Sequence, residues 1–236
     1  MQRKSALKKH PPFPSRPRFH LQDFPGFSRN DLQNLERYYR HQLRDFDAPE
    51  KRVGWNTAQS QRVRFEALTS VGPLRGAKIL DIGCGLGAFW GFLRERKLRV
   101  DYTGLDLFPN MVQEAQRLYP EAKFEARLIL SRPYPPRRFD YSFLSGVFNV
   151  KVEDNWKYMR AILLSALRQS RKAVAFNVLN THAGIREKDR FTVDPKELVA
   201  FGRGLGVSRV RLMDLYHHLD LTLFLYKPQH RSREAS

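Results

Sequence analysis

The chain has 236 residues, of which 42% are hydrophobic and 28% charged, so it can fill the core of one folded domain. A single cysteine excludes an intrachain disulfide and a multi-cysteine metal site, and no metal is predicted. No apolar run approaches the roughly 18 residues of a membrane span, and a cytoplasmic location is expected.

The formal net charge is +18, and residues 1–20 contribute +6 of it, so the remaining 216 residues still carry +12. A basic surface attracts anionic partners such as nucleic acid, acidic small molecules or membrane surfaces. It also serves simply as a solvated, solubilising surface. The charge therefore leaves the partner open.

Residues 1–28 form a basic, proline-rich arm that we expect to be extended and flexible, because proline blocks helix and sheet. A helix should follow, with Ser28 or Asn30 as its cap. After a break with proline and glycine, a second helix is predicted from about Thr57 to Val71. We expect these helices, within residues 29–74, to form a lid or substrate-binding region.

From Ala77 onward, short apolar strands alternate with helices, which predicts a mostly parallel sheet covered on both faces. The predicted strands are Lys78–Ile82, Asp101–Leu105, Lys123–Ala126, Tyr141–Leu144, Ala173–Val178, Ser208–Leu215 and Leu219–Tyr226. The predicted helices are Ala88–Lys97, Pro109–Tyr119, Asp154–Gln169 and Asp194–Leu205. The expected fold is a doubly wound α/β sheet of seven strands over residues 75–228, closed by an antiparallel hairpin, with a basic tail at 229–236.

One strand, at residues 79–82, ends in glycines and leads at once into a helix. Glycines at 83, 85 and 87 let the backbone turn tightly and approach a ligand, and the helix start offers free N–H groups. Asp106 ends the next strand, where a carboxylate can accept both hydroxyls of a ribose. This pattern predicts a nucleotide-like cofactor.

Taken alone, Gly83, Gly85 and Ala88 also satisfy the G-x-G-x-x-A pattern of dinucleotide sites. A nicotinamide-dependent oxidoreductase is therefore an alternative. Short-chain dehydrogenases need a Tyr-x-x-x-Lys pair on one helical face. Tyr119 and Lys123 have this spacing, but a proline separates them at a helix-to-strand junction, so we interpret the match as coincidence.

The segment Leu80-Asp81-Ile82-Gly83-Cys84-Gly85-x-Gly87 resembles the first motif of class I S-adenosylmethionine-dependent methyltransferases, a Rossmann-like family. Gly104–Phe108 resembles the family's second-strand motif, and Phe139–Gly146 resembles its fourth strand, which ends beside the methionine portion. The resemblance covers about residues 75–227 and implies S-adenosylmethionine as cofactor. The cofactor-binding residues that it implies are Asp81, Gly83, Cys84, Gly85, Gly87, Asp106, Leu107, Ser145 and Gly146.

The sequence departs from this family at the adenine site. Many relatives carry an acid after the third strand that accepts the adenine amino group, whereas this chain has Arg127, which cannot accept a hydrogen bond. Adenine recognition is left to backbone groups or apolar walls. A weaker resemblance, through Gly54-Trp55-Asn56 and Ser145–Asn149, links the chain to a group of bacterial methyltransferases and implies no substrate.

The sulfonium already makes the cofactor's methyl group electrophilic, so a general base is needed only if the acceptor still holds a proton. Histidine suits this role because it titrates near neutral pH. The candidate catalytic residues are His182, His217 and Asn149, with His218 and Asp220 as further bases. The candidate lid or substrate residues are Tyr39, Trp55 and Arg64.

A small-molecule acceptor is the first hypothesis, because the N-terminal helices would suit a closed pocket. A nucleic-acid methyltransferase that uses the basic surface is the alternative. Against it, Ser145–Asn149 stands where base-amino methyltransferases carry an Asn-Pro-Pro-Tyr or Asp-Pro-Pro-Tyr sequence. A non-catalytic scaffold is the third hypothesis, which the intact glycine loop disfavours.

Overall fold

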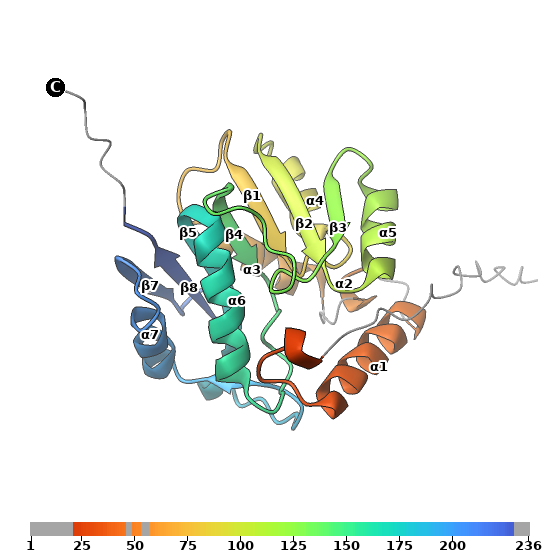
Figure 1. Cartoon of the computed structure of the whole chain (residues 1–236), viewed down its shortest axis with the longest axis vertical. Helices are drawn as coiled ribbons and strands as arrows, with labels where there is room; N and C mark the ends of the chain where they lie inside the picture. The colour runs from red at the N-terminus through yellow and green to blue at the C-terminus, as the bar shows by residue number, and fades with distance from the viewer. Residues whose placement is uncertain (1–20, 46–48, 53–56, 229–236) are drawn as a thin grey trace, which may run out of the picture.

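The computed structural model describes residues 21–45, 49–52 and 57–228, which form one mixed sheet between layers of helices (Figure 1). The strands lie in the order β3-β2-β1-β4-β5-β8-β7, and β6 pairs with the end of β5. Their bounds are β1 (Lys78–Ile82), β2 (Asp101–Asp106), β3 (Lys123–Ala126), β4 (Phe139–Leu144), β5 (Ser170–Asn180), β6 (Thr192–Val193), β7 (Arg209–Met213) and β8 (Asp220–Tyr226). Strands β1 to β5 are parallel and β8 is antiparallel to both neighbours, which confirms the predicted fold.

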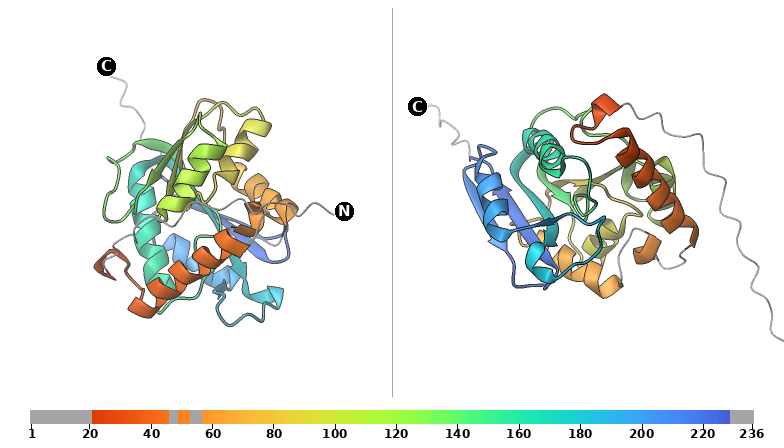
Figure 2. Two further views of the ribbon diagram at one scale, coloured as in Figure 1. Left: turned by 90° about the vertical axis from the view of Figure 1, so that its right-hand side faces the viewer. Right: turned by 90° about the horizontal axis from the view of Figure 1, so that it is seen from below.

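Helices cover both faces of this sheet, as Figure 2 shows. The helices are α1 (Arg29–Asp45), α2 (Pro49–Arg52), α3 (Ala58–Thr69), α4 (Ala88–Glu95), α5 (Pro109–Leu118), α6 (Asn155–Gln169) and α7 (Pro195–Arg203), with single 3-10 turns at η1 (Leu21–Asp23) and η2 (Thr181–Ala183). Side chains of α6 and α7 join the core on one face, and those of α3, α4 and α5 join it on the other. No helix in this described part is long and apolar enough to cross a membrane.

The sequences of the central strands are nearly continuous apolar runs because helices cover both faces of the sheet. Four of the five residues of β1 are buried, and β8 is buried from Asp220 to Leu225. Each fully buried leucine or phenylalanine contributes about 1.5–3 kcal/mol. Burial on two faces is therefore the main stabilising term for the strands that carry the site.

Side-chain caps set where the helices begin. The hydroxyl of Ser28 accepts from the N–H of Asp31 at 3.1 Å, while the Asp31 carboxylate accepts from the N–H of Ser28 at 2.8 Å. This reciprocal pair selects Ser28 over Asn30 as the cap of α1. Thr57 caps α3 in the same way, accepting from the N–H of Ser60 at 3.0 Å.

The structure adds short elements to those expected. A helical turn, α2, lies inside the predicted proline and glycine break, and Arg52 ties it to α5 through Glu114 at 3.2 Å. The two-residue β6 had no pattern long enough to be predicted. Trp55, most of the N-terminal arm and the basic tail lie outside the described residues.

The parallel strands β1, β2 and β4 end at the same edge of the sheet, so the loops that follow them meet there. Helix α1 lies beside this edge, at the lower right of Figure 1 and in the view from below in Figure 2. Ligands of open α/β sheets bind at the carboxyl ends of the strands. This edge is therefore where the candidate site is built.

Candidate functional site

The loop between β1 and α4 has a shape that only glycine permits. Gly83, Gly85 and Gly87 have φ values of +75°, +53° and +79°. A Cβ at Gly83 would lie 2.6 Å from Cγ2 of Val147, and a Cβ at Gly87 would lie 2.7 Å from Cζ of Phe124. The loop therefore keeps a bare backbone leading into α4, whose first N–H groups have no side-chain cap and no partner within the helix.

Asp106 ties this loop to the end of β2. One carboxylate oxygen accepts from the N–H of Gly85 at 2.8 Å, and the other accepts from the N–H of Phe108 at 2.9 Å. Burial raises the pKa of Asp106, an effect that these backbone donors oppose. A carboxylate has about four acceptor positions, so the backbone donors leave room for a hydroxyl donor such as that of a ribose.

Asp81 lies deeper, on β1, and is almost fully buried. It accepts from the hydroxyl of Tyr102 at 2.6 Å and lines the same cavity as Asp106. Burial raises the pKa of Asp81 to about 7; the Tyr102 hydrogen bond lowers it and the charge of Asp106 raises it further. Burial also raises the pKa of the Cys84 thiol, so we infer that Cys84 packs as a small apolar residue and is not a nucleophile.

Replacing Asp81 with asparagine is expected to change how the free energy of unfolding depends on pH. The carboxyl titrates near 3.8 when unfolded and near 7 when folded, so the folded state binds more protons between these values. By linkage, the wild-type protein loses stability as the pH rises through this window, and the Asp81→Asn variant lacks that loss. Urea unfolding of the cofactor-free protein at both ends of the window measures it. A variant whose stability differs from wild type equally at both ends contradicts the account.

The cavity is lined from four sides. Phe24 comes from the turn between η1 and α1, and Leu35, Tyr38 and Tyr39 come from α1. The loop after β4 contributes Ser145, Gly146, Val147 and Asn149. Apolar side chains follow β2 and β3, namely Leu107, Phe108, Met111, Leu128 and Ile129. These offer an apolar wall near Asp106, where the sequence left adenine recognition open.

The three predicted catalytic residues do not lie together in the structure. Asn149 lines the cavity, whereas His182 and His217 do not. His182 is exposed and lies 3.1 Å from the carboxylate of Asp194. His217 lies 2.9 Å from Asp220, and burial and the charge of Arg64 lower its pKa. A catalytic role for these side chains stays a prediction.

The predicted lid residues Tyr39 and Arg64 also lie in different places. The ring of Tyr39 packs 5.3 Å from that of Phe108 inside the cavity, and burial and nearby Asp106 raise its pKa. Arg64 does not line the cavity but is buried between α3 and β8, in an ion pair with Asp220. Sequence reasoning assigned no site role to Gln61, Tyr158 and Arg190, which line the cavity. Arg190 carried no local pattern that marks it.

Replacing Gly87 with alanine is expected to weaken cofactor binding and to destabilise the fold by about 1–3 kcal/mol, the usual cost of overpacking. The added Cβ would lie within 3.0 Å of both Phe124 and Tyr119, so the loop must shift. Gly76→Ala is the matched control, because Gly76 has φ +73° but no atom within 4 Å of its Cβ position. Urea unfolding and a cofactor titration of both variants measure the difference. Equal effects in the two variants would show that backbone strain, and not crowding, dominates.

Comparison with known proteins identifies the site's family. The family model described as a methyltransferase domain matches residues 79–170, from β1 to the first residue of β5. A Mycobacterium tuberculosis protein named as a methyltransferase is 31% identical over 155 residues, which cover 63% of this chain and 92% of that protein. This chain belongs to the class I S-adenosylmethionine-dependent methyltransferases. It is thus a methyltransferase with S-adenosylmethionine as cofactor, and the dinucleotide and scaffold alternatives are set aside.

Solved methyltransferase structures share the fold. DhpI in complex with S-adenosylmethionine and a ligand abbreviated HEP superposes with a TM-score of 0.62 at 19% identity, covering 85% of this chain and 99% of that one. Magnesium protoporphyrin IX methyltransferase of Synechocystis with bound S-adenosylhomocysteine gives a TM-score of 0.57 at 13% identity, covering 83% and 94%.

The glycine loop, Asp106 and the start of α4 fit the cofactor. Side chains at Gly83 and Gly87 would enter space that Val147 and Phe124 already occupy, so these two positions must stay glycine. The carboxylate of Asp106 keeps acceptor positions for a ribose, and the helix start of α4 supplies free N–H groups. A site with these groups suits a nucleoside.

Proposed function

We propose that the protein transfers the methyl group of S-adenosylmethionine directly to a small molecule held beneath α1. The observation that carries the proposal is that Phe24, Tyr38 and Tyr39 line the same cavity as Gly85 and Asp106. The N-terminal segment thus covers the carboxyl edge of the sheet. A covered cavity suits a small acceptor better than a polymer.

The cofactor brings a methyl group on a sulfonium, which is already electrophilic. A lone pair of the acceptor forms the new bond to the methyl carbon while the carbon–sulfur bond breaks toward sulfur, leaving S-adenosylhomocysteine. The chain's own residues align the acceptor and exclude water, and such positioning can lower a barrier by about 7–11 kcal/mol in favourable cases.

The loop after β4 is built to be rigid. The side-chain carbonyl of Asn177, on β5, accepts from the N–H of Gly146 at 2.8 Å, and the Asn177 amide reaches the hydroxyl of Ser145 at 3.4 Å. Asn177 is fully buried. It therefore acts as a positioning residue for the loop that also presents Asn149 to the cavity.

No histidine lines the cavity among the residues that the structure describes. The described residues therefore supply no imidazole in the cavity that could remove a proton from the acceptor. An acceptor that is already deprotonated near neutral pH needs no such base. This favours acidic small molecules over alcohols and simple phenols.

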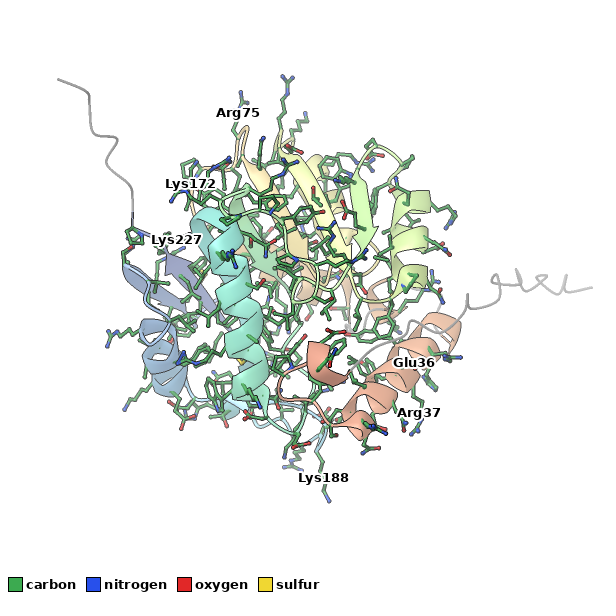
Figure 3. All side chains as sticks on the ribbon, in the orientation of Figure 1. Glu36, Arg37, Arg75, Lys172, Lys188 and Lys227 are labelled. Carbon is green, nitrogen blue, oxygen red and sulfur yellow. The ribbon has the colours of Figure 1, made fainter. Side chains whose placement is uncertain are left out.

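Part of the positive charge of the described surface lies away from the cavity. Cationic side chains lie at the strand edge opposite the cavity, near the starts of β1–β5 and β7 and the end of β8, and these are Arg75, Lys78, Arg99, Lys123, Arg137, Arg138, Arg171, Lys172, Arg209 and Lys227. Figure 3 shows Arg75, Lys172 and Lys227 at the end of the molecule away from Glu36 and Arg37 of α1. Phosphates bound there would not bring a base to the cofactor.

Tritiated methyl transfer distinguishes the two acceptor classes. The protein is incubated with methyl-labelled S-adenosylmethionine and either a low-molecular-weight cell extract or total RNA from the same cells. We expect label in the small-molecule fraction and none in RNA, with no transfer by an Asp106→Ala variant. Label in RNA, lost on that substitution, would overturn the proposal in favour of a nucleic-acid acceptor.

A further inference from the structure

Two arginines, Arg127 and Arg190, line the cavity. Arg127 is neutralised within the fold, because its Nε lies 3.0 Å from the carboxylate of Glu125 and its guanidinium stacks 4.1 Å from the ring of Tyr134. Arg190 differs. No carboxylate of the described residues lies within ion-pair distance of it, and the charges of Asp189 and Glu187 in its own loop act on it only from farther away.

The backbone fixes Arg190 beside the loop that follows β4. It forms an antiparallel bridge with Val150, flanked by a hydrogen bond from the N–H of Phe191 to the carbonyl of Asn149 at 3.0 Å. On the other side, the N–H of Lys151 donates to the carbonyl of Asp189 at 2.8 Å. A cation presented from such a paired segment has a defined position in the cavity.

The aromatic ring of Tyr38, on α1, lies 5.6 Å from the guanidinium carbon of Arg190. Tyr38 also lines the cavity, so the helix that covers the site holds the cation at its wall. The Tyr38 side chain also hydrogen-bonds Arg190, but a guanidinium has five N–H donors, so donors remain for a second partner. A forked donor matches the two oxygens of a carboxylate or phosphate.

We propose that Arg190 binds an anionic oxygen group of the methyl acceptor, a carboxylate, phosphate or phosphonate. The inference rests on the proposed function, since it names the chemistry of the small molecule in that cavity. Arg190 is thereby a specificity-determining residue of the acceptor site.

Inorganic phosphate and acetate serve as probes, titrated by calorimetry into protein saturated with S-adenosylhomocysteine at constant ionic strength. We expect saturable binding in the millimolar range, weakened about tenfold or more in Arg190→Gln, because a charge-assisted forked contact is lost. Arg190→Lys should recover part of the affinity, since it keeps the charge without the fork. Lys188→Gln is the matched control, because Lys188 belongs to the same loop but points away from the molecule (Figure 3).

Two results overturn this inference. One is the absence of phosphate and acetate binding to the wild-type protein, or equal binding to Arg190→Gln. The other is a loss of S-adenosylhomocysteine affinity in Arg190→Gln, which would assign the guanidinium to the cofactor's carboxylate. Either result leaves the proposed function standing if neutral small molecules are methylated. Transfer of label to RNA, in contrast, overturns the proposed function whether or not phosphate and acetate bind.

Discussion

An Asp106→Ala variant is expected to bind S-adenosylmethionine about a hundredfold more weakly, or not measurably, because charge-assisted hydrogen bonds contribute about 1.5–3 kcal/mol each. The substitution removes the acceptor of the Gly85 and Phe108 N–H groups and the proposed acceptor of the ribose hydroxyls. The loop then loses its tether to β2 as well as its ligand contact. Equilibrium dialysis with labelled S-adenosylhomocysteine measures the loss.

Asp101→Ala is the control for this variant. Asp101 is an exposed aspartate at the first residue of the same strand, at the far edge of the sheet from the cavity. It should leave the affinity unchanged. Wild-type affinity in Asp106→Ala would show that the ribose lies elsewhere, and circular dichroism of both variants checks that they are folded.

Arg64→Met is expected to destabilise the protein by about 3–5 kcal/mol, the usual cost of removing one member of a buried ion pair. Arg64 and Asp220 are 2% and 0% exposed, so water cannot solvate the carboxylate that remains, and the His217 ring 2.9 Å away is left as its neighbour. The pair joins α3 to β8, and Arg64 also donates to the carbonyl of Ser60 at 2.6 Å. Urea unfolding of the cofactor-free protein measures the free energy of unfolding.

A double variant, Arg64→Met with Asp220→Leu, should be more stable than the single Arg64→Met variant, because it leaves no uncompensated buried charge. Arg62→Met on the same helix is the control. Arg62 pairs with Glu95 at the surface, at 2.6 Å, and exposed pairs contribute little. If Arg64→Met is no more destabilising than Arg62→Met, the buried pair does not stabilise the fold.

The sequence predicted the sheet well because its strands differ sharply in composition from the helices between them. The predicted ranges Lys78–Ile82 and Lys123–Ala126 match β1 and β3 residue for residue. The ends of β5 were harder, since Ser170 and Asn180 are polar and pair with neighbours for reasons that lie outside the local pattern. The glycine loop was predictable because its backbone conformation leaves few residue types to choose from.

The acceptor side of the cavity was less predictable, because it is assembled from segments far apart in the chain. Arg190 becomes part of the site only through its bridge to Val150 and the approach of Tyr38. Arg64 belongs to the N-terminal helices that we expected to form a lid, yet its guanidinium pairs with Asp220 on the last strand. Such pairings depend on the tertiary fold, which no spacing rule encodes.

The most direct test of the account is a calorimetric titration of the wild-type protein with S-adenosylhomocysteine beside NAD. The glycine loop, Asp106 and helix α1 line one cavity, to which we assign the methyl donor. We expect saturable micromolar binding of S-adenosylhomocysteine, one molecule per chain, and no heat of binding with NAD. Binding of NAD without S-adenosylhomocysteine would contradict it and return the glycine loop to a dinucleotide site.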